Sequence, residues 1–480
     1  MIVRRFYDEG LAQASYLIGC AETGEAVVVD PNRDVDQYLD AAEAEGLRVT
    51  HVTETHIHAD FVSGLRELAH RTGARIYLSA EGGEEWQYGF GDDEETGAAE
   101  RVLLRDGDEF RVGHVRLRAV HTPGHTPEHL TFLVTDGAAA DEHIAALTGD
   151  FLFVGDVGRP DLLEKAAGVA GTMEPGARQL FRSLRRFLET YPDWLQVWPG
   201  HGAGSACGKS IGAVPQSTIG YERRFNWALH YEDEDEFVRA VLEGQPEPPK
   251  YFAEMKRINR VGPRILNGLP VPERQAAQRL PAVLDVGEPV VDIRPARSFG
   301  AGHIPGTINI PLDRSFTTWA GWFIPYDSDF HLLADDERSV VEAVRALALI
   351  GLDRVAGWFD TGALNHWHES GRGDLQSVPR IGVDQLRPHL TSADFALVDV
   401  RGESEWLAGH LPGARNIPLG YLPDHLGELP RDRDVVVYCE TGARSAIAVG
   451  LLQAAGFENV AHVKGGLAAV RAAATGAEAA

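Results

Sequence analysis

The sequence predicts an α/β protein made of one large N-terminal domain followed by two copies of a smaller domain. A length of 480 residues exceeds what one ordinary hydrophobic core fills, and a hydrophobic content of 44% is enough for several cores. Through about residue 210, short β-rich runs alternate with helical stretches. A segment that begins at Val291 recurs at Val398. Together, these observations indicate two or three α/β domains.

In the N-terminal part, the run EAVVVD precedes a helical pattern with Val35, Tyr38 and Ala42 on one face, and the β-rich run LRVTHVTET follows. Helical periodicity resumes after THIHAD and stops at Gly73. The THIHAD segment therefore lies on a loop between a strand and a helix, where functional residues commonly lie.

The chain between Ser217 and about residue 270 is polar and charged, which is typical of a helical extension and a connector. We expect four segments: a large domain with its helical extension over 1–250, a connector over 251–275, and small domains over 276–373 and 378–475.

The repeat consists of VDIRPARSFGAGHIPGTINIPL, from Val291, and VDVRGESEWLAGHLPGARNIPL, from Val398, so the offset is 398 − 291 = 107 residues. Solenoid repeats have periods of about 20 to 50 residues. A period this long indicates a duplicated domain of about 100 residues.

Composition restricts the class of partner and the compartment. The chain has 45 basic and 71 acidic side chains, a net charge of −26, which disfavours nucleic acids as partners. Three widely spaced cysteines do not indicate a disulfide framework, and no stretch reaches the roughly 18 apolar residues of a membrane span. We expect a soluble cytoplasmic protein that acts on small molecules and has no membrane partner.

Four segments of the large domain supply metal-ligating residue types. They are THIHAD from Thr55, HTPGHT from His121, TGD ending at Asp150, and PGHG with His201, and each follows a β-like run. Imidazole and carboxylate groups on loops at one edge of a sheet are typical of a metal site.

The order and the sequences of these segments resemble those of the metallo-β-lactamase superfamily over residues 1 to about 250. The resemblance implies an αββα sandwich with metal between loops at one edge. Two-metal members have the signature His-x-His-x-Asp-His, and here Phe61 replaces the last histidine, a ligand of the second metal. Phe61 cannot bind metal, so we expect one metal ion per chain, without the two-metal bridging hydroxide of the hydrolases.

A site of His56, His121 and Asp150 has the two-histidine, one-carboxylate composition of non-haem Fe(II) oxygenases. The chain also resembles the persulfide dioxygenases, whose iron ligands match these three residues. That resemblance implies one Fe(II) per chain and, in the segment GDVGRPDL, Arg159 facing the carboxylate or phosphate of a thiol substrate.

The remaining residues of these segments then have supporting roles. His58, Asp60 and His201 orient the ligands or hydrogen-bond iron-bound species, and Phe61 keeps the open iron positions dry. Cys207, six residues after His201, is a candidate sulfur relay, with a small buried hydrophobe as the alternative interpretation.

The second small copy contains VVVYCETGARSAIAVGLL, a β-branched run that leads through Cys439 and a short loop into an apolar helix. This pattern resembles a rhodanese, in which backbone N–H groups and a helix N-terminus face the sulfur and favour a thiolate or persulfide anion. The resemblance implies that Cys439 carries sulfur and that Arg444 holds an anionic sulfur donor such as thiosulfate.

The first small copy has acidic residues, Asp335, Asp336 and Glu337, where the cysteine loop is expected. It cannot carry sulfur, and we expect a structural spacer or a docking surface.

Taken together, the chain resembles persulfide dioxygenase-rhodanese fusions. The resemblance implies oxidation of a low-molecular-weight thiol persulfide by dioxygen to sulfite and free thiol, with Cys439 making or using thiosulfate, and assembly into dimers or tetramers. Two alternatives stay open: a zinc thioester hydrolase of the glyoxalase II type, and a non-enzymatic sulfur carrier.

Overall fold

The computed structural model describes residues 1–91, 96, 100–165, 171–245, 247–386, 390 and 395–478. The chain divides into two compact units. The first comprises Met1–Leu269 and Arg345–Gly351, and the second comprises Pro270–Val344 and Leu352–Ala480. Among the described residues, no helix has the length and apolar content that crossing a membrane requires.

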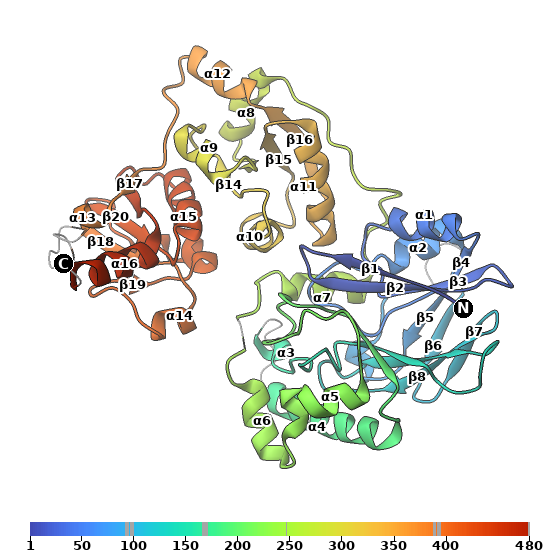
Figure 1. Ribbon diagram of the computed structural model, residues 1–480. Helices are drawn as coiled ribbons and strands as arrows, with labels where there is room; N and C mark the ends of the chain where they lie inside the picture. The colour runs from blue at the N-terminus through green and yellow to red at the C-terminus, as the bar shows by residue number, and fades with distance from the viewer. Residues whose placement is uncertain are drawn as a thin grey trace. The chain divides into compact units, whose positions relative to one another are not determined.

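The first unit contains two six-stranded sheets (Figure 1). The first sheet has the order β1-β2-β3-β4-β5-β6 and the second the order β12-β11-β10-β9-β8-β7. The strands of the first sheet are β1 (Ile2–Asp8), β2 (Gln13–Cys20), β3 (Glu25–Val29), β4 (Arg48–Thr53), β5 (Arg75–Ser79) and β6 (Arg101–Leu104). Those of the second are β7 (Glu109–Val112), β8 (Val115–His121), β9 (Leu130–Asp136), β10 (Ala145–Gly149), β11 (Gln196–Pro199) and β12 (Ser217–Thr218).

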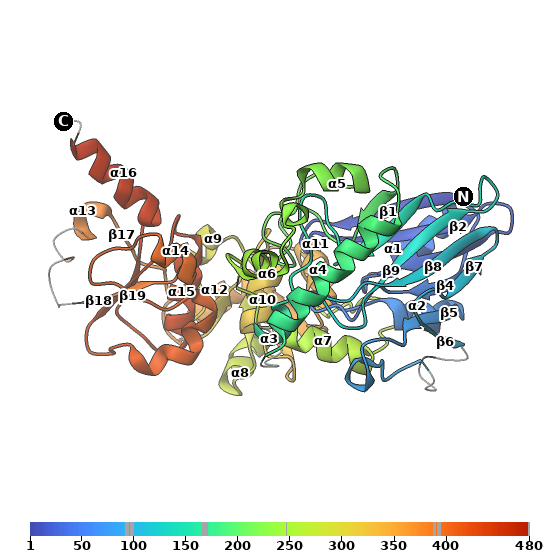
Figure 2. The same ribbon diagram turned by 90° about the horizontal axis from the view of Figure 1, so that it is seen from below.

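Helices cover the outer faces of both sheets, α1 and α2 on one side and α4 and α5 on the other (Figures 1 and 2). The helices of this unit are α1 (Asp36–Ala44), α2 (Leu65–Thr72), α3 (Leu162–Lys165), α4 (Met173–Thr190), α5 (Ile219–Phe225), α6 (Glu234–Leu242) and α7 (Phe252–Val261). A short 3₁₀ turn spans Glu84–Trp86.

Three apolar layers hold these elements together. Tyr16, Val27 and Phe132 belong to the layer between the sheets. The layer under α1 and α2 includes Tyr38, and the layer under α4 includes Leu180. Strand β2 is buried along its whole length because both of its faces are covered. The predicted αββα sandwich is confirmed.

The second unit contains two parallel sheets (Figure 1). The four-stranded sheet has the order β14-β13-β15-β16, and the five-stranded sheet repeats this order as β19-β18-β20-β21 and adds β17. The strands are β13 (Val290–Asp292), β14 (Ile308–Asn309), β15 (Phe330–Ala334), β16 (Val355–Asp360), β17 (Arg380–Ile381), β18 (Phe395–Asp399), β19 (Arg415–Asn416), β20 (Asp434–Tyr438) and β21 (Val460–Val463). The expectation of two tandem α/β domains with parallel sheets is confirmed.

The helices that follow in the chain are α8 (Leu280–Asp285), α9 (Ala296–Ala301), α10 (Phe316–Phe323), α11 (Glu337–Leu349), α12 (Gly362–Glu369), α13 (Val383–Leu386), α14 (Glu403–Leu407), α15 (Ala443–Ala454) and α16 (Gly466–Glu478). From Arg345 onward, α11 belongs to the first unit. The domain boundaries expected from the sequence stay predictions.

The repeated VDIR and VDVR motifs have a structural role. Asp292 and Arg294 form a buried ion pair with N···O of 2.6 Å, and Asp399 and Arg401 form the same pair at 2.7 Å. Each aspartate ends a parallel strand, so the ion pair fixes the turn that leaves the sheet. The repeat therefore reflects a common fold.

Candidate metal centre and cysteine loop

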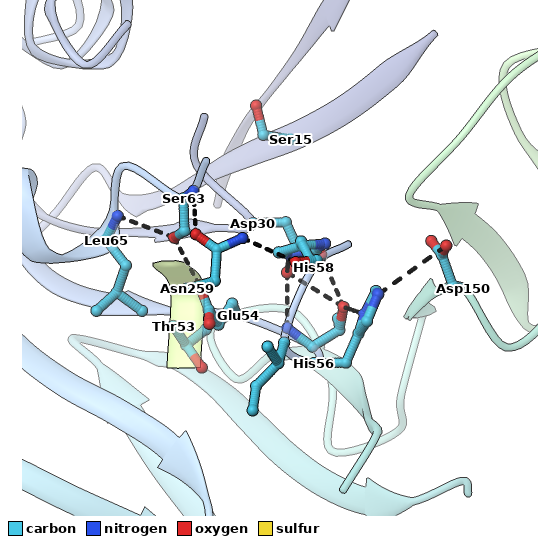
Figure 3. A network of polar contacts seen from close by, with 12 residues as sticks. Ser15, Asp30, Thr53, Glu54, His56, His58, Ser63, Leu65, Asp150 and Asn259 are labelled. Atoms are coloured by element: carbon cyan, nitrogen blue, oxygen red, sulfur yellow. Dashed lines mark hydrogen bonds and ion pairs between the residues drawn. The ribbon is translucent and has the colours of Figure 1, made fainter. Parts of the chain in front are cut away.

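The THIHAD loop follows β4 and is held by Asp30, the residue after β3 (Figure 3). The Asp30 carboxylate accepts hydrogen bonds from the backbone N–H of Thr55 at 2.6 Å and from Nε2 of His58 at 3.1 Å. Asp30 itself has φ of +52°, a left-handed conformation that non-glycine residues adopt at some cost.

A second carboxylate fixes the middle of the same loop. Oε1 of Glu128 accepts a 2.8 Å hydrogen bond from the backbone N–H of Ile57, between His56 and His58. Burial raises the pKa of Glu128 to about 7.

His56, His125 and Asp150 converge at the edge of the sandwich. Their ligand atoms lie within 4.8 Å of one another, and all three side chains are buried. Oδ2 of Asp150 lies 3.9 Å from Nε2 of His56 and 3.6 Å from Nε2 of His125. The residues come from the loops after β4, β8 and β10, as expected for a site at one sheet edge.

The hydrogen bonds made by two histidine rings indicate that this centre fits a cation. Nδ1 of His125 donates to the carbonyl of Arg159 at 3.1 Å, and Nδ1 of His201 donates to the carbonyl of Ala12 at 3.0 Å. In a neutral ring, Nε2 then carries a lone pair. These Nε2 atoms face Asp150, whose buried carboxylate oxygens accept no hydrogen bond from the described residues. Lone pairs that face one another require a positive charge between them, and the imidazole and carboxylate donor set suits a divalent metal.

A second group of possible metal ligands adjoins the first. Asp60, His201 and Cys207 have ligand atoms within 4.8 Å of one another. Nε2 of His201 lies 3.2 Å from Asp60 Oδ2 and 3.4 Å from Asp150 Oδ1, so His201 connects the two groups. Burial, together with the charges of Asp60 and Asp150, raises the pKa of the Cys207 thiol well above its usual value, and the thiol is therefore protonated.

His58 and Phe61 lie behind the ligand group. Burial opposes a charge on His58, but the hydrogen bond to Asp30 and the surrounding carboxylates raise its pKa to about 9. Its Nδ1 is buried and has no hydrogen-bond partner among the described residues. The fully buried Phe61 ring packs against His58 with the ring centres 4.3 Å apart.

The structure does not bring His121, the predicted ligand, to His56 and Asp150, and His125 lies there instead. His121 ends β8, and its Nε2 lies 2.7 Å from the carbonyl oxygen of Pro127. The sequence HTPGHT offers two histidines four residues apart, and only the turn through Gly124, with φ of +147°, determines which one faces the site.

The prediction that Arg159 contacts the substrate also differs from the structure. Its guanidinium is fully buried and pairs with both carboxylate oxygens of Asp161, at 2.9 and 2.8 Å. A third nitrogen donates to the carbonyl of Ala206 at 2.9 Å. Arg159 therefore connects the His125 loop, through its own carbonyl, to the segment that carries Cys207.

Cys439 lies between β20 and α15, as the sequence predicts. The backbone N–H of Gly442 donates to its sulfur at 3.1 Å, and Gly442 has φ of +105°. Ser445 lies 3.7 Å from the sulfur and 3.2 Å from Nδ1 of the buried His462, two contacts that sequence reasoning missed. The loop therefore presents a hydrogen-bond donor and a helix N-terminus to the sulfur, which favours an anionic form.

Arg444 is already engaged by a carboxylate. Its two terminal nitrogens donate to Glu405 at 2.6 and 2.8 Å. An anionic sulfur donor has to compete with Glu405 for this guanidinium. In the first copy, Asp336 accepts a 2.8 Å hydrogen bond from the backbone N–H of Ser339, so one of the acidic residues there acts as the cap of α11.

Comparison with known proteins agrees with this architecture. The metallo-beta-lactamase superfamily profile matches residues 8–201, and the rhodanese-like domain profile matches residues 382–473. A probable metallo-hydrolase of Burkholderia pseudomallei is 30% identical, with 59% of this chain and 99% of that protein aligned. The mitochondrial persulfide dioxygenase ETHE1 of Homo sapiens is 27% identical over 50% of this chain and 80% of that protein.

Among solved structures, a metallo-beta-lactamase from Staphylococcus aureus subsp. aureus COL is 41% identical, with a TM-score of 0.66, and the alignment covers 75% of this chain and 98% of that one. The chain belongs to the metallo-beta-lactamase superfamily, carries a C-terminal rhodanese-like domain, and has persulfide dioxygenases among its relatives.

Proposed function

We propose that the protein is an Fe(II)-dependent persulfide dioxygenase whose second rhodanese-like copy transfers sulfur through Cys439. The observation that carries the proposal is the ligand group itself: two neutral histidines and one carboxylate, with Phe61 where two-metal hydrolases have a further ligand. The likeness to a persulfide dioxygenase supports the same assignment.

The overall reaction is R–SSH + O₂ + H₂O → R–SH + SO₃²⁻ + 2H⁺, in which the terminal sulfur is oxidised and dioxygen is reduced. Bound Fe(II) would supply the site at which dioxygen and the persulfide sulfur meet. His56, His125 and Asp150 would hold the metal, and the carbonyl of Arg159 fixes the tautomer of His125. The buried surroundings exclude bulk water from the reacting groups.

Cys439 would perform the second reaction. It takes sulfur from a donor as R–SSH + Cys–S⁻ → R–SH + Cys–S–S⁻, and passes it on as Cys–S–S⁻ + SO₃²⁻ → Cys–S⁻ + S₂O₃²⁻. The same steps run in reverse regenerate persulfide from thiosulfate. Joining both sites in one chain raises the effective concentration of the shared product.

Metal analysis of anaerobically purified protein, followed by oxygen uptake on adding glutathione persulfide, tests the proposal. We expect about one iron per chain and rapid uptake, with sulfite and thiosulfate as products. Two zinc ions per chain, no uptake and thioester hydrolysis would replace it with the hydrolase alternative, which the unpartnered Nδ1 of His58 favours as an additional ligand. No uptake and no hydrolysis would leave a sulfur carrier.

A further inference from the structure

Arg159 is buried and its guanidinium hydrogen-bonds Asp161 and the carbonyl of Ala206, so it is engaged within the protein. A hollow of about 520 Å³ lies beside the loop that carries His125, with Gly124 and Pro127 of that loop on one wall. The first turn of α4 and the 3₁₀ turn at Trp86 also line it. Its volume is in the range of small-molecule sites.

The hollow is also lined by Glu85 and by two cations from one face of α7, Lys256 and Arg260, four residues apart. Nζ of Lys256 lies 4.0 Å from the centre of the Trp86 ring, and a guanidinium nitrogen of Arg260 donates to the backbone carbonyl of Glu85 at 2.9 Å. These contacts hold both positive charges at the hollow. In a chain with a net charge of −26, such a pair is a specific attraction for an anion.

Burial leaves the charge of Lys256 poorly solvated. Burial, the largest effect, lowers the pKa of its ammonium, and the nearby Arg260 lowers it further. Glu128 and Glu85 oppose these effects without reversing them. A bound anion would stabilise the charged form of Lys256.

The hollow is also close to the metal loop. Glu128, whose charge acts on Lys256, accepts the hydrogen bond from Ile57 in the middle of THIHAD. Asn259, between the two cations on α7, donates to the carbonyls of His58 and Phe61 at 2.8 and 2.7 Å (Figure 3). Helix α7 therefore contacts the metal loop with one side chain and lines the hollow with two others.

We propose that this hollow binds the anionic, non-reacting part of the thiol persulfide, with Lys256 and Arg260 as the pair that recognises its carboxylate or phosphate. The identity of the ligand rests on the proposed function, whereas the anion site itself does not. The thiols that fit are those with acidic groups, such as glutathione with carboxylates or coenzyme A with phosphates.

The test compares wild type, a Lys256→Gln/Arg260→Gln double variant and the control Arg257→Gln, all in the full chain. Arg257 is exposed on the same helix and pairs with Glu254. Calorimetric titration with reduced glutathione and with reduced coenzyme A measures binding without turnover. We expect the double variant to bind at least one thiol about tenfold or more weakly and the control to bind as wild type does. Weaker binding of glutathione would identify a carboxylate as the recognised anion, and weaker binding of coenzyme A would identify a phosphate.

In oxygen uptake, the double variant should raise KM for the persulfide of that thiol with little change in kcat, and leave the persulfide of uncharged 2-mercaptoethanol unaffected. Because Lys256 is partly buried, the exposed single variant Arg260→Gln provides a second, milder test. Equal thiol affinities in wild type and both variants, or no binding of either thiol to wild type, would overturn the anion site. Absence of uptake with every persulfide, despite charge-dependent binding, would overturn only the proposed function.

Discussion

The side-chain amide of Asn259 donates a 2.8 Å hydrogen bond to the carbonyl of His58, two residues past His56 of the proposed ligand group (Figure 3). The same amide donates to Phe61 O at 2.7 Å, and its oxygen accepts from the N–H of Ser63 at 2.9 Å. One buried residue of α7 thus fixes three backbone groups of the metal loop.

We expect Asn259→Asp, which is nearly isosteric but loses the two donated bonds, to lower metal affinity about 10 to 100-fold. The loop carbonyls would then lack their buried donor, and His56 would lose its fixed position. Chelator competition on the purified protein measures this, with Glu254→Gln on the same helix as the control. Unchanged affinity in Asn259→Asp would mean that α7 only covers the loop.

The two histidines of HTPGHT provide a direct test of the ligand assignment. His125→Ala should abolish stoichiometric metal binding, because it removes the lone pair that faces Asp150. His121→Ala should keep the metal, because Nε2 of His121 lies 2.7 Å from the Pro127 carbonyl oxygen and the ring is not part of the ligand group. Metal analysis of both variants distinguishes the two assignments. Metal retained in His125→Ala and lost in His121→Ala would restore His121 as the ligand.

Cys439→Ser should keep oxygen uptake and shift the product from thiosulfate to sulfite, since the oxidation and the sulfur transfer use separate groups. Ion chromatography of the products measures the ratio. The matched control is Cys20→Ser, a buried cysteine of the sandwich core. A product ratio that stays at the wild-type value would contradict a role for Cys439 in transfer.

The variant Cys207→Ser tests whether Cys207 relays sulfur. The raised pKa of this buried thiol keeps it protonated and weakly nucleophilic, so we expect thiosulfate yield and iron content to remain at wild-type levels. A fall in thiosulfate yield at unchanged iron content would instead support sulfur transfer through Cys207.

Glu128 should make stability dependent on pH. Its folded pKa of about 7 lies above the usual 4.5, so its contribution is complete below about pH 4.5 and is lost as pH rises through about 7. The loss is of the order of 3 kcal/mol. Thermal unfolding midpoints between pH 4.5 and 7.5 should fall less steeply in Glu128→Gln than in wild type. Parallel curves would show that folding does not raise the pKa of Glu128.

The sequence by itself determined the αββα sandwich, the duplicated parallel α/β copies, the loops that carry the site, and the position of Cys439. The sandwich was implied by the resemblance of the metal-ligating segments to a known superfamily. The other features follow from periodicity, an internal repeat and short segments at strand ends, all of which are local in the chain. His56 and Asp150 were predictable for the same reason, since Asp150 directly follows β10 and His56 lies on the loop just after β4.

Only the tertiary structure decided between His121 and His125, turned Arg159 inward onto Asp161, and brought Asn259 to His58 across 201 residues. It also paired Arg444 with Glu405. The physical reason is that hydrogen-bond partners of a buried polar group are set by whatever packing brings within about 3 Å, and this distance bears no relation to separation along the chain.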